Sequence, residues 1–285
     1  MMNTVSFAVL ALIALATLIF FIVRTKSYFI VFLFLAYVGM IYVFEYVILV
    51  LFHSYTYHPR MLPDPYMDSM MGAFISNFLT VPTLGLAMVI YRLRFRWAIL
   101  FSCLMIGIEW LFLRLGIYEH EWWRLSYSFV AFIFFFWLVS FWARRVEHGN
   151  RLFQYVSLLM FSLSVLNTLA FVRMLVNIGI FEPGFFENPT RDDVAFTVPY
   201  VFLKGILLTN AIYWTRKLRW TLAVVAVLLG LHYVLVSAGI LKLFISPWTY
   251  WPIYTISLLV GAGLIWLAMR LLRRPAGSAP GIGRG

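Results

Sequence analysis

Cysteine is almost absent from this sequence: Cys103 is the only one, and it lies within an apolar stretch. One cysteine cannot form an intrachain disulfide, so the fold cannot depend on such a bond. Phosphate-binding loops, dinucleotide-binding glycine motifs and nucleophile elbows are also missing. The sequence therefore predicts no cofactor and gives no basis for naming a catalytic residue.

Charged residues are scarce as well, at 12% of the chain, whereas hydrophobic residues make up 64%. A soluble domain is only about half apolar, so this composition excludes an ordinary soluble globule. The apolar stretches are long enough to cross a bilayer as helices. We therefore predict an all-α, polytopic integral membrane protein whose first partner is the lipid bilayer.

The apolar stretches number nine. The first lacks a basic leading region and a small-residue cleavage site, and Arg24 and Lys26 follow it, so we interpret it as a retained span rather than a removed signal peptide. The predicted spans are approximately 4–23, 27–52, 72–91, 97–117, 125–143, 152–179, 195–215, 220–241 and 249–269.

The net charge of +11 does not indicate nucleic-acid binding, because the basic residues recur in short clusters between spans. Alternate connections carry most of the 22 basic residues and a single acid, Glu147, whereas most of the 11 acids lie in the other connections. Basic loops stay in the cytoplasm, so this alternation predicts a cell-membrane protein with its N-terminus outside and its C-terminus inside. The sequence does not specify an oligomeric state.

Similar sequence motifs recur in the same order in the two halves of the chain. Thr80-Val81-Pro82 and Thr197-Val198-Pro199 are each followed by a basic turn, a span and an aromatic loop. We predict two parallel four-helix repeats related by a pseudo-twofold axis along the membrane normal. The predicted divisions are an extra N-terminal helix at 1–26, repeats at 27–148 and 149–274, and a disordered tail at 275–285.

Ionisable side chains inside spans are costly and mark a site or an internal pair. Arg114 falls at the outer boundary, where it would snorkel to the headgroups. The others lie near the midplane or in the outer half, and we predict that they line an outward-facing polar cavity between the repeats and bind a ligand. These candidate residues are Glu45, Glu109, Arg173, Lys204 and His232.

The same residues have structural interpretations. Glu109 would pair with Arg173, Lys204 or His232 to hold the bundle together, and His232 would be a hydrogen-bonded packing residue. Glu109 and Gly116 lie seven residues apart, as do His232 and Gly239, so each glycine would allow close helix approach beside its polar residue. No spacing favours a metal site among the acids and histidines of the outer loops, namely His53, His58, Asp64, Asp68, Glu119, His120 and Glu121.

Three functions fit this pattern. Three permanent cations, Arg114, Arg173 and Lys204, stand against two carboxylates, with His232 titratable between them, and this predicts binding or transport of a small anionic or zwitterionic solute. A membrane-embedded enzyme acting on a lipid-soluble substrate would use Glu109 as acid and His232 as base or relay. A non-catalytic envelope or spore-membrane component would use its outer loops to dock a partner.

One set of residues in the first repeat carries a resemblance to known proteins: Pro82, Leu84-Gly85-Leu86, Glu109-Trp110, Gly116-Ile117-Tyr118, Trp122, Trp123 and Tyr127-Ser128-Phe129. With these residues the repeat resembles a family of small multi-pass membrane proteins of unknown function from endospore-forming Gram-positive bacteria. The second repeat departs from the pattern, with His232 for the glutamate and Leu241 for the tyrosine. The resemblance implies a helical membrane fold and no particular activity.

Overall fold

The computed structural model describes residues 2–272, and they form a helical protein with two very small sheets. Within this part of the chain, nine helices are long and apolar enough to cross a membrane. The prediction of an all-α, polytopic membrane protein is confirmed. The tail predicted at 275–285 lies outside the described residues.

The chain divides into two compact units, Met1–Gln154 and Tyr155–Arg273. The predicted repeat boundary at 148–149 lies a few residues before this division. The placement of the units relative to each other is not determined, so each is described by itself.

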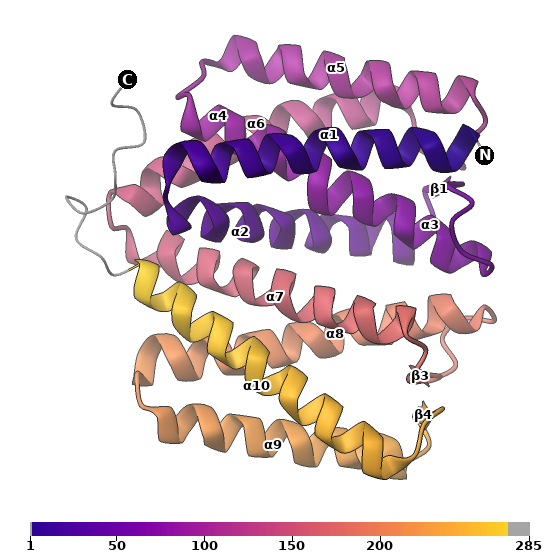
Figure 1. Ribbon diagram of the computed structural model, residues 1–285, viewed down its shortest axis with the longest axis vertical. Helices are drawn as coiled ribbons and strands as arrows, with labels where there is room; N and C mark the ends of the chain where they lie inside the picture. The colour runs from indigo at the N-terminus through magenta and orange to yellow at the C-terminus, as the bar shows by residue number, and fades with distance from the viewer. Residues whose placement is uncertain (1, 273–285) are drawn as a thin grey trace. The chain divides into compact units, whose positions relative to one another are not determined.

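Unit 1 holds five of the nine spans and one pair of strands (Figure 1). Two short π-helical segments occur in it: η1 ends the second span, and η2 interrupts the third. Its elements are α1 (Met2–Thr25), α2 (Tyr28–Glu45), η1 (Tyr46–Leu51), β1 (Tyr55–Tyr57), α3 (Pro65–Phe74), η2 (Ile75–Thr80), α4 (Val81–Ile90), α5 (Phe95–Arg114), β2 (Tyr118–His120) and α6 (Leu125–Glu147).

Unit 2 follows the same order from α7 onward, with strands after its first and third helices. It begins at Tyr155, one turn into α7, and has no counterpart of α1. Its elements are α7 (Arg151–Leu175), β3 (Gly179–Phe181), α8 (Pro189–Asn210), η3 (Ala211–Thr215), α9 (Leu218–Ser237), β4 (Leu241–Leu243) and α10 (Pro247–Leu272).

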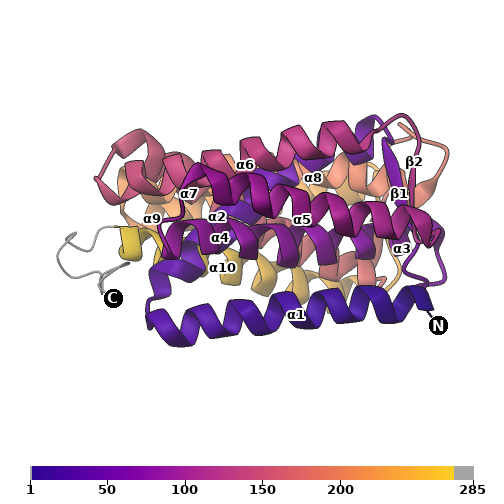
Figure 2. The same cartoon turned by 90° about the horizontal axis from the view of Figure 1, so that it is seen from above.

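Each sheet is an antiparallel pair at one end of its unit, which we call the strand end. Tyr57 is opposite Tyr118 in the β1–β2 pair, and Phe181 is opposite Leu241 in the β3–β4 pair. Figure 2 shows β1 and β2 side by side next to the start of α3. Gly72 permits the close packing of α3 against β1, because a Cβ there would lie 2.5 Å from the Tyr57 Cβ.

The third and seventh spans begin earlier than the hydropathy predicted, at Pro65 and Pro189. In each case the preceding side chain caps the helix: Asp64 accepts from the Met67 N–H, and Asn188 from the Arg191 N–H. A polar cap followed by proline at the first helical position is a strong helix start. The first turns are polar enough to resemble a loop in a hydropathy profile.

The predicted role of the two glycines in helix packing is wrong. Gly116 and Gly239 have φ of +65° and +72°, and no atom lies within 4 Å of a Cβ built on either. Each follows the last residues of a helix, where a left-handed residue ends the helix and glycine adopts that conformation without strain. Their equal spacing from Glu109 and His232 reflects equal helix endings.

The Thr-Val-Pro motifs are not at matching positions in the two units. Pro82 lies 17 residues after the first residue of its span, Pro65, whereas Pro199 lies 10 residues after Pro189. The expected match of Pro82 with Pro199 is therefore wrong. The positions that do match are Glu109 and His232, each the fifteenth residue of its helix. The pseudo-twofold relation between units stays a prediction.

Candidate functional site

A cavity of about 80 Å³ lies within unit 1, beside the strand end, and we call it the carboxylate cavity. Its walls come from both strands and from helices on all sides, including Phe7 and Leu10 of α1. The helix predicted as an addition in front of the repeat is thus part of this site. Among the lining residues are two carboxylates, Glu45 and Glu109, and no lysine or arginine.

The remaining lining residues are aromatic, apolar or small and polar. The aromatic ones are Phe7, Phe44, Tyr55, Tyr57, Phe112, Tyr118, Trp123 and Phe132. The small polar ones are Ser76, Asn77 and Ser128, and the apolar ones are Leu10, Met105, Ile108 and Ala131.

Glu109 is held by two side chains from other elements of unit 1. The Ser128 hydroxyl of α6 donates to Glu109 Oε1 at 2.8 Å, and His120 Nε2 lies 2.8 Å from the same oxygen. Trp123 Nε1–H donates in turn to the Ser128 oxygen at 2.7 Å. Burial lowers the pKa of His120, so the neutral ring donates from Nε2 to the carboxylate at neutral pH.

Among the described residues, only one of the two carboxylate oxygens of Glu45 has a hydrogen-bond partner. The Tyr55 hydroxyl donates to Glu45 Oε1 at 2.6 Å, while the buried Oε2 has no hydrogen-bond partner among the described residues. Asn77 lies beside this carboxylate and is 7% exposed, and its Nδ2 also lacks a partner within the described chain. A buried polar atom without a partner costs about 1–3 kcal/mol, and because Asn77 Nδ2 is a donor and Glu45 Oε2 an acceptor, a rotation of the Asn77 amide or one bridging water would satisfy both.

π-Helical segments place these polar groups. Glu45 is the last residue before η1, and Ser76 and Asn77 lie within η2, where the Val81 N–H donates to the Ser76 carbonyl five residues back. Pro82 follows η2, and its missing N–H and bulky ring disfavour the ordinary helical bonding pattern just before it. Single π turns inside helices occur frequently at functional sites.

The strand end above the cavity carries three histidine–glutamate pairs. His120 pairs with Glu109, and the others join His58 Nε2 to Glu119 Oε2 at 3.4 Å and His53 Nε2 to Glu121 Oε1 at 4.0 Å. No group of three or more metal-type side chains that could hold an ion occurs within residues 2–272. Burial raises the pKa values of Tyr55, Tyr57 and Tyr118 well above 10, with the nearby glutamates adding to the effect, so these phenols stay neutral.

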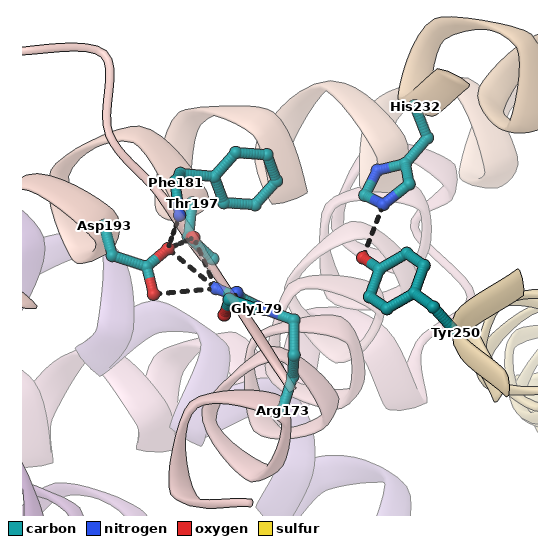
Figure 3. A network of polar contacts seen from close by, with 7 residues as sticks. All are labelled: Arg173, Gly179, Phe181, Asp193, Thr197, His232 and Tyr250. Carbon is teal, nitrogen blue, oxygen red and sulfur yellow. Dashed lines mark hydrogen bonds and ion pairs between the residues drawn. The ribbon is translucent and has the colours of Figure 1, made fainter. Parts of the chain in front are cut away.

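In unit 2, Arg173 forms a buried ion pair within its own unit. Its Nη2 lies 2.7 and 2.9 Å from the two carboxylate oxygens of Asp193, and its Nη1–H donates to the Gly179 carbonyl (Figure 3). The Phe181 N–H and the Thr197 hydroxyl also donate to Asp193, at 3.1 and 2.9 Å. This network joins α7 and α8 to β3, so Arg173 serves a structural role.

His232 is surrounded by tyrosines. Its Nε2 lies 2.7 Å from the Tyr250 hydroxyl, and its Nδ1 lies 3.2 Å from the Tyr200 hydroxyl (Figure 3 shows the Tyr250 contact). The Tyr254 ring stacks on the imidazole with centroids 3.6 Å apart. Both ring nitrogens have partners and His232 is 1% exposed, which fits a packing residue.

Lys204 packs against the same tyrosines. Its Nζ lies 4.4 Å from the centroid of the Tyr200 ring and 5.7 Å from that of Tyr254. No carboxylate among the described residues lies within 4 Å of it. The Lys204 ammonium is therefore stabilised by cation–π contacts with these two rings.

The five predicted site residues thus fall into different surroundings. Glu45 and Glu109 share the carboxylate cavity of unit 1, while Arg173, Lys204 and His232 belong to unit 2. The pairing predicted between Glu109 and Arg173, Lys204 or His232 is not found among the described residues: Glu109 contacts His120 and Ser128, and Arg173 pairs with Asp193. Sequence reasoning placed Asp193 in a loop, and it missed His120, Ser128 and Asn77 as parts of the site.

Comparisons with known proteins give no match. No family model, no curated protein and no solved structure matches it. The resemblance suggested by the first repeat stays a prediction, and the function must be argued from the site itself.

Proposed function

We propose that this chain is a membrane protein that binds, and through that binding transports, a small solute carrying a positive charge. The observation that supports the proposal is the carboxylate cavity, where Glu45 and Glu109 line about 80 Å³ of space without a basic lining residue. Two buried carboxylates in one cavity repel each other, and a cation between them relieves both the repulsion and the loss of hydration.

This proposal changes the charge expected from the sequence. An anionic or zwitterionic solute was expected because three permanent cations were predicted to share one site with two carboxylates. In the structure Asp193 balances the charge of Arg173. The charged residues that line the cavity of unit 1 are the two carboxylates alone. A zwitterionic solute remains compatible, since its positive group would enter the cavity.

We place the strand ends on the outer side of the cell membrane. The basic turns between α1 and α2 and between α4 and α5 lie away from the strands along the chain, with Arg24, Lys26, Arg92 and Arg94 in or beside them. Basic connections favour the cytoplasm. The cavity would then be reached from outside, beneath β1 and β2.

A panel of small solutes tests the proposal. The purified protein in lipid nanodiscs is heated with methylamine, glycine or acetate at equal ionic strength, and the unfolding midpoint is measured. A ligand that binds only the folded state raises the midpoint once its concentration exceeds its Kd, and the increase then grows with the logarithm of the concentration. We expect stabilisation by methylamine, a smaller effect of glycine and none of acetate, with the methylamine effect lost in Glu109→Gln.

The control variant is Glu121→Gln, which removes an exposed carboxylate of the strand end outside the cavity lining. It should respond to methylamine as the unaltered protein does. Stabilisation by acetate but not by methylamine would overturn the proposal and restore the anionic one. No response to any solute, in all variants, would instead support the structural envelope component.

An enzyme is the second candidate, because Glu109 and His120 form a carboxylate–imidazole pair beside the cavity at 2.8 Å. Such a pair can transfer protons in general acid–base catalysis. The partner of Glu109 in this mechanism is His120 rather than the predicted His232. Turnover of a lipid-soluble substrate that is abolished by His120→Gln, with unchanged methylamine binding, would identify it.

A further inference from the structure

We infer that the group bound in the carboxylate cavity is an alkylated ammonium, recognised by an aromatic cage together with Glu45 and Asn77. The inference rests on the proposed function and narrows it from a small cation to one chemical class. It excludes bare alkali and divalent metal ions as the preferred ligands. Four features of unit 1 support it.

The first feature is the size of the cavity. At about 80 Å³ it holds roughly two or three waters at ~30 Å³ each, or a group of about four or five non-hydrogen atoms. Pockets that enclose whole drug-sized ligands are about 300–1,000 Å³. The cavity therefore accommodates a headgroup such as a methylated ammonium, and any longer part of a ligand must lie outside it.

The second feature is the chemistry of the walls. Rings of Phe44, Tyr57, Phe112 and Trp123 contribute to the lining, along with four more aromatic residues. Aromatic faces attract cations whose charge is spread over methyl groups, because such cations lose little hydration on entering an apolar site. Recognition of quaternary and methylated ammonium by aromatic cages follows from this balance.

The third feature is the unsatisfied polar pair. Glu45 Oε2 accepts no hydrogen bond and Asn77 Nδ2 donates none within the described chain, although both atoms are buried. A partly alkylated ammonium such as methylammonium donates an N–H to Glu45 Oε2, whereas a quaternary ammonium, which has no N–H, interacts with the carboxylate through its charge and with the rings through its methyl groups. The Asn77 amide can present its oxygen to the same ligand by turning over, since its two ends are interchangeable in shape.

The fourth feature is the poor fit to a metal ion. Calcium takes six to eight oxygen ligands and magnesium a nearly ideal octahedron. Within residues 2–272 no group of three or more histidine, cysteine, aspartate or glutamate side chains is arranged to hold a metal ion. Glu45 and Glu109 already use one oxygen each in bonds to Tyr55, Ser128 and His120. Too few oxygens remain for a complete coordination shell.

The test measures binding of two labelled probes to the full chain in nanodiscs: carbon-14 tetramethylammonium and sodium-22, each competed by unlabelled methylammonium, sodium and potassium. We expect saturable tetramethylammonium binding that methylammonium displaces and that sodium or potassium at equal ionic strength does not. Glu45→Gln should weaken it at least tenfold, while Glu119→Gln, at an exposed position outside the lining, should change it less than twofold.

Two further variants test whether the aromatic cage controls binding. Phe44→Leu removes a partly exposed ring, and it should weaken tetramethylammonium more than methylammonium, by about five- to thirtyfold. Ser76→Tyr introduces the residue found at the matching position of unit 2, Tyr200, and should fill the cavity and abolish binding. Both positions are eleven residues after the first proline of their spans.

The outcomes distinguish the alkylammonium inference from the proposed cation binding. Saturable sodium binding that depends on Glu45, with weaker tetramethylammonium binding, would overturn the alkylammonium inference and leave the proposed cation binding intact. Absence of saturable binding by either probe to the folded protein would overturn both. Equal loss of tetramethylammonium and methylammonium in Phe44→Leu would contradict the aromatic cage.

Discussion

The ion pair between Arg173 and Asp193 should be the most sensitive polar contact of unit 2. Both side chains are largely buried, with relative exposures of 11% and 3%. Asp193→Asn keeps acceptors for the Phe181 N–H and the Thr197 hydroxyl but leaves the guanidinium without its counter-charge. Removing one partner of a buried pair costs about 3–5 kcal/mol, and the retained hydrogen bonds place this variant near the lower end, at about 3 kcal/mol of unfolding free energy.

The measurement is unfolding in mixed detergent–SDS micelles, where the free energy of unfolding can be compared between variants. Glu182→Gln is the matched control, because it breaks the Lys242–Glu182 pair, whose side chains are 57% and 32% exposed. An exposed pair contributes about 0–1 kcal/mol. If Asp193→Asn costs no more than Glu182→Gln, the guanidinium is solvated and the reasoning from burial is refuted.

A double variant tests the same reasoning from the other direction. In unit 1 the neutral Ser69 accepts the N–H of Tyr57 at 3.0 Å, at the position that matches Asp193. Arg173→Met combined with Asp193→Ser should therefore recover most of the stability lost in Asp193→Asn, since no buried charge is left unpaired. Recovery would show that the ion pair provides a strand anchor that a neutral pair can replace.

Three further results are expected. Gly72→Ala should destabilise unit 1 by about 1–3 kcal/mol in the same unfolding assay, because its Cβ would lie 2.5 Å from the Tyr57 Cβ, whereas Gly107→Ala, with open space around it, should be neutral or stabilising. The unfolding midpoint should fall as the pH drops below about 6.5, because the unfolded chain then protonates His120 while the buried ring, with its lowered pKa, does not; His120→Gln should flatten this dependence. In a cysteine-free background, a cysteine placed at Glu121 should be labelled by an impermeant reagent from outside and one at Arg94 from the cytoplasm, and labelling of both from one side would contradict the proposed orientation.

The fold class could be predicted because it depends on composition and length alone. Long apolar runs specify spans wherever they occur, so the nine helices were found from hydropathy. The starts at Pro65 and Pro189 were missed because polar first turns lower the mean hydropathy. The signal was present in the Asp64-Pro65 and Asn188-Pro189 pairs, which a search for helix caps would have detected.

The polar partners within the site could not be predicted to the same degree. Glu109 and Glu45 stood out because a charge inside an apolar run is costly wherever it points. Their partners are a loop-edge histidine, a serine and a tyrosine, which are common residues without a distinctive spacing. They come together because β1 pairs with β2 and because η1 and η2 rotate the helix faces, and neither feature leaves a hydropathy signal.

The comparison of matching positions explains why unit 1 has a polar cavity while unit 2 has a packed aromatic cluster. Ser128 and Tyr250 are each the fourth residue of the last helix of their unit, and each donates to or contacts the polar residue at the fifteenth position of the preceding long helix. Ser76 and Tyr200 match in the same way. In unit 2 the two phenol hydroxyls converge on His232, so the rings occupy space and satisfy both imidazole nitrogens.

In unit 1 the same two positions carry serine, and the polar residue is a carboxylate rather than a neutral ring. The side chains are smaller by a phenyl ring each, which leaves space beside a carboxylate that needs a counter-charge. The two units thus surround a buried polar residue differently: tyrosines enclose His232 in unit 2, and a cavity lies beside Glu109 in unit 1. Ser76→Tyr should fill the cavity of unit 1, and Tyr200→Ser should open space at the matching position of unit 2. Methylammonium binding should therefore be lost from unit 1 in the first variant and gained in unit 2 in the second.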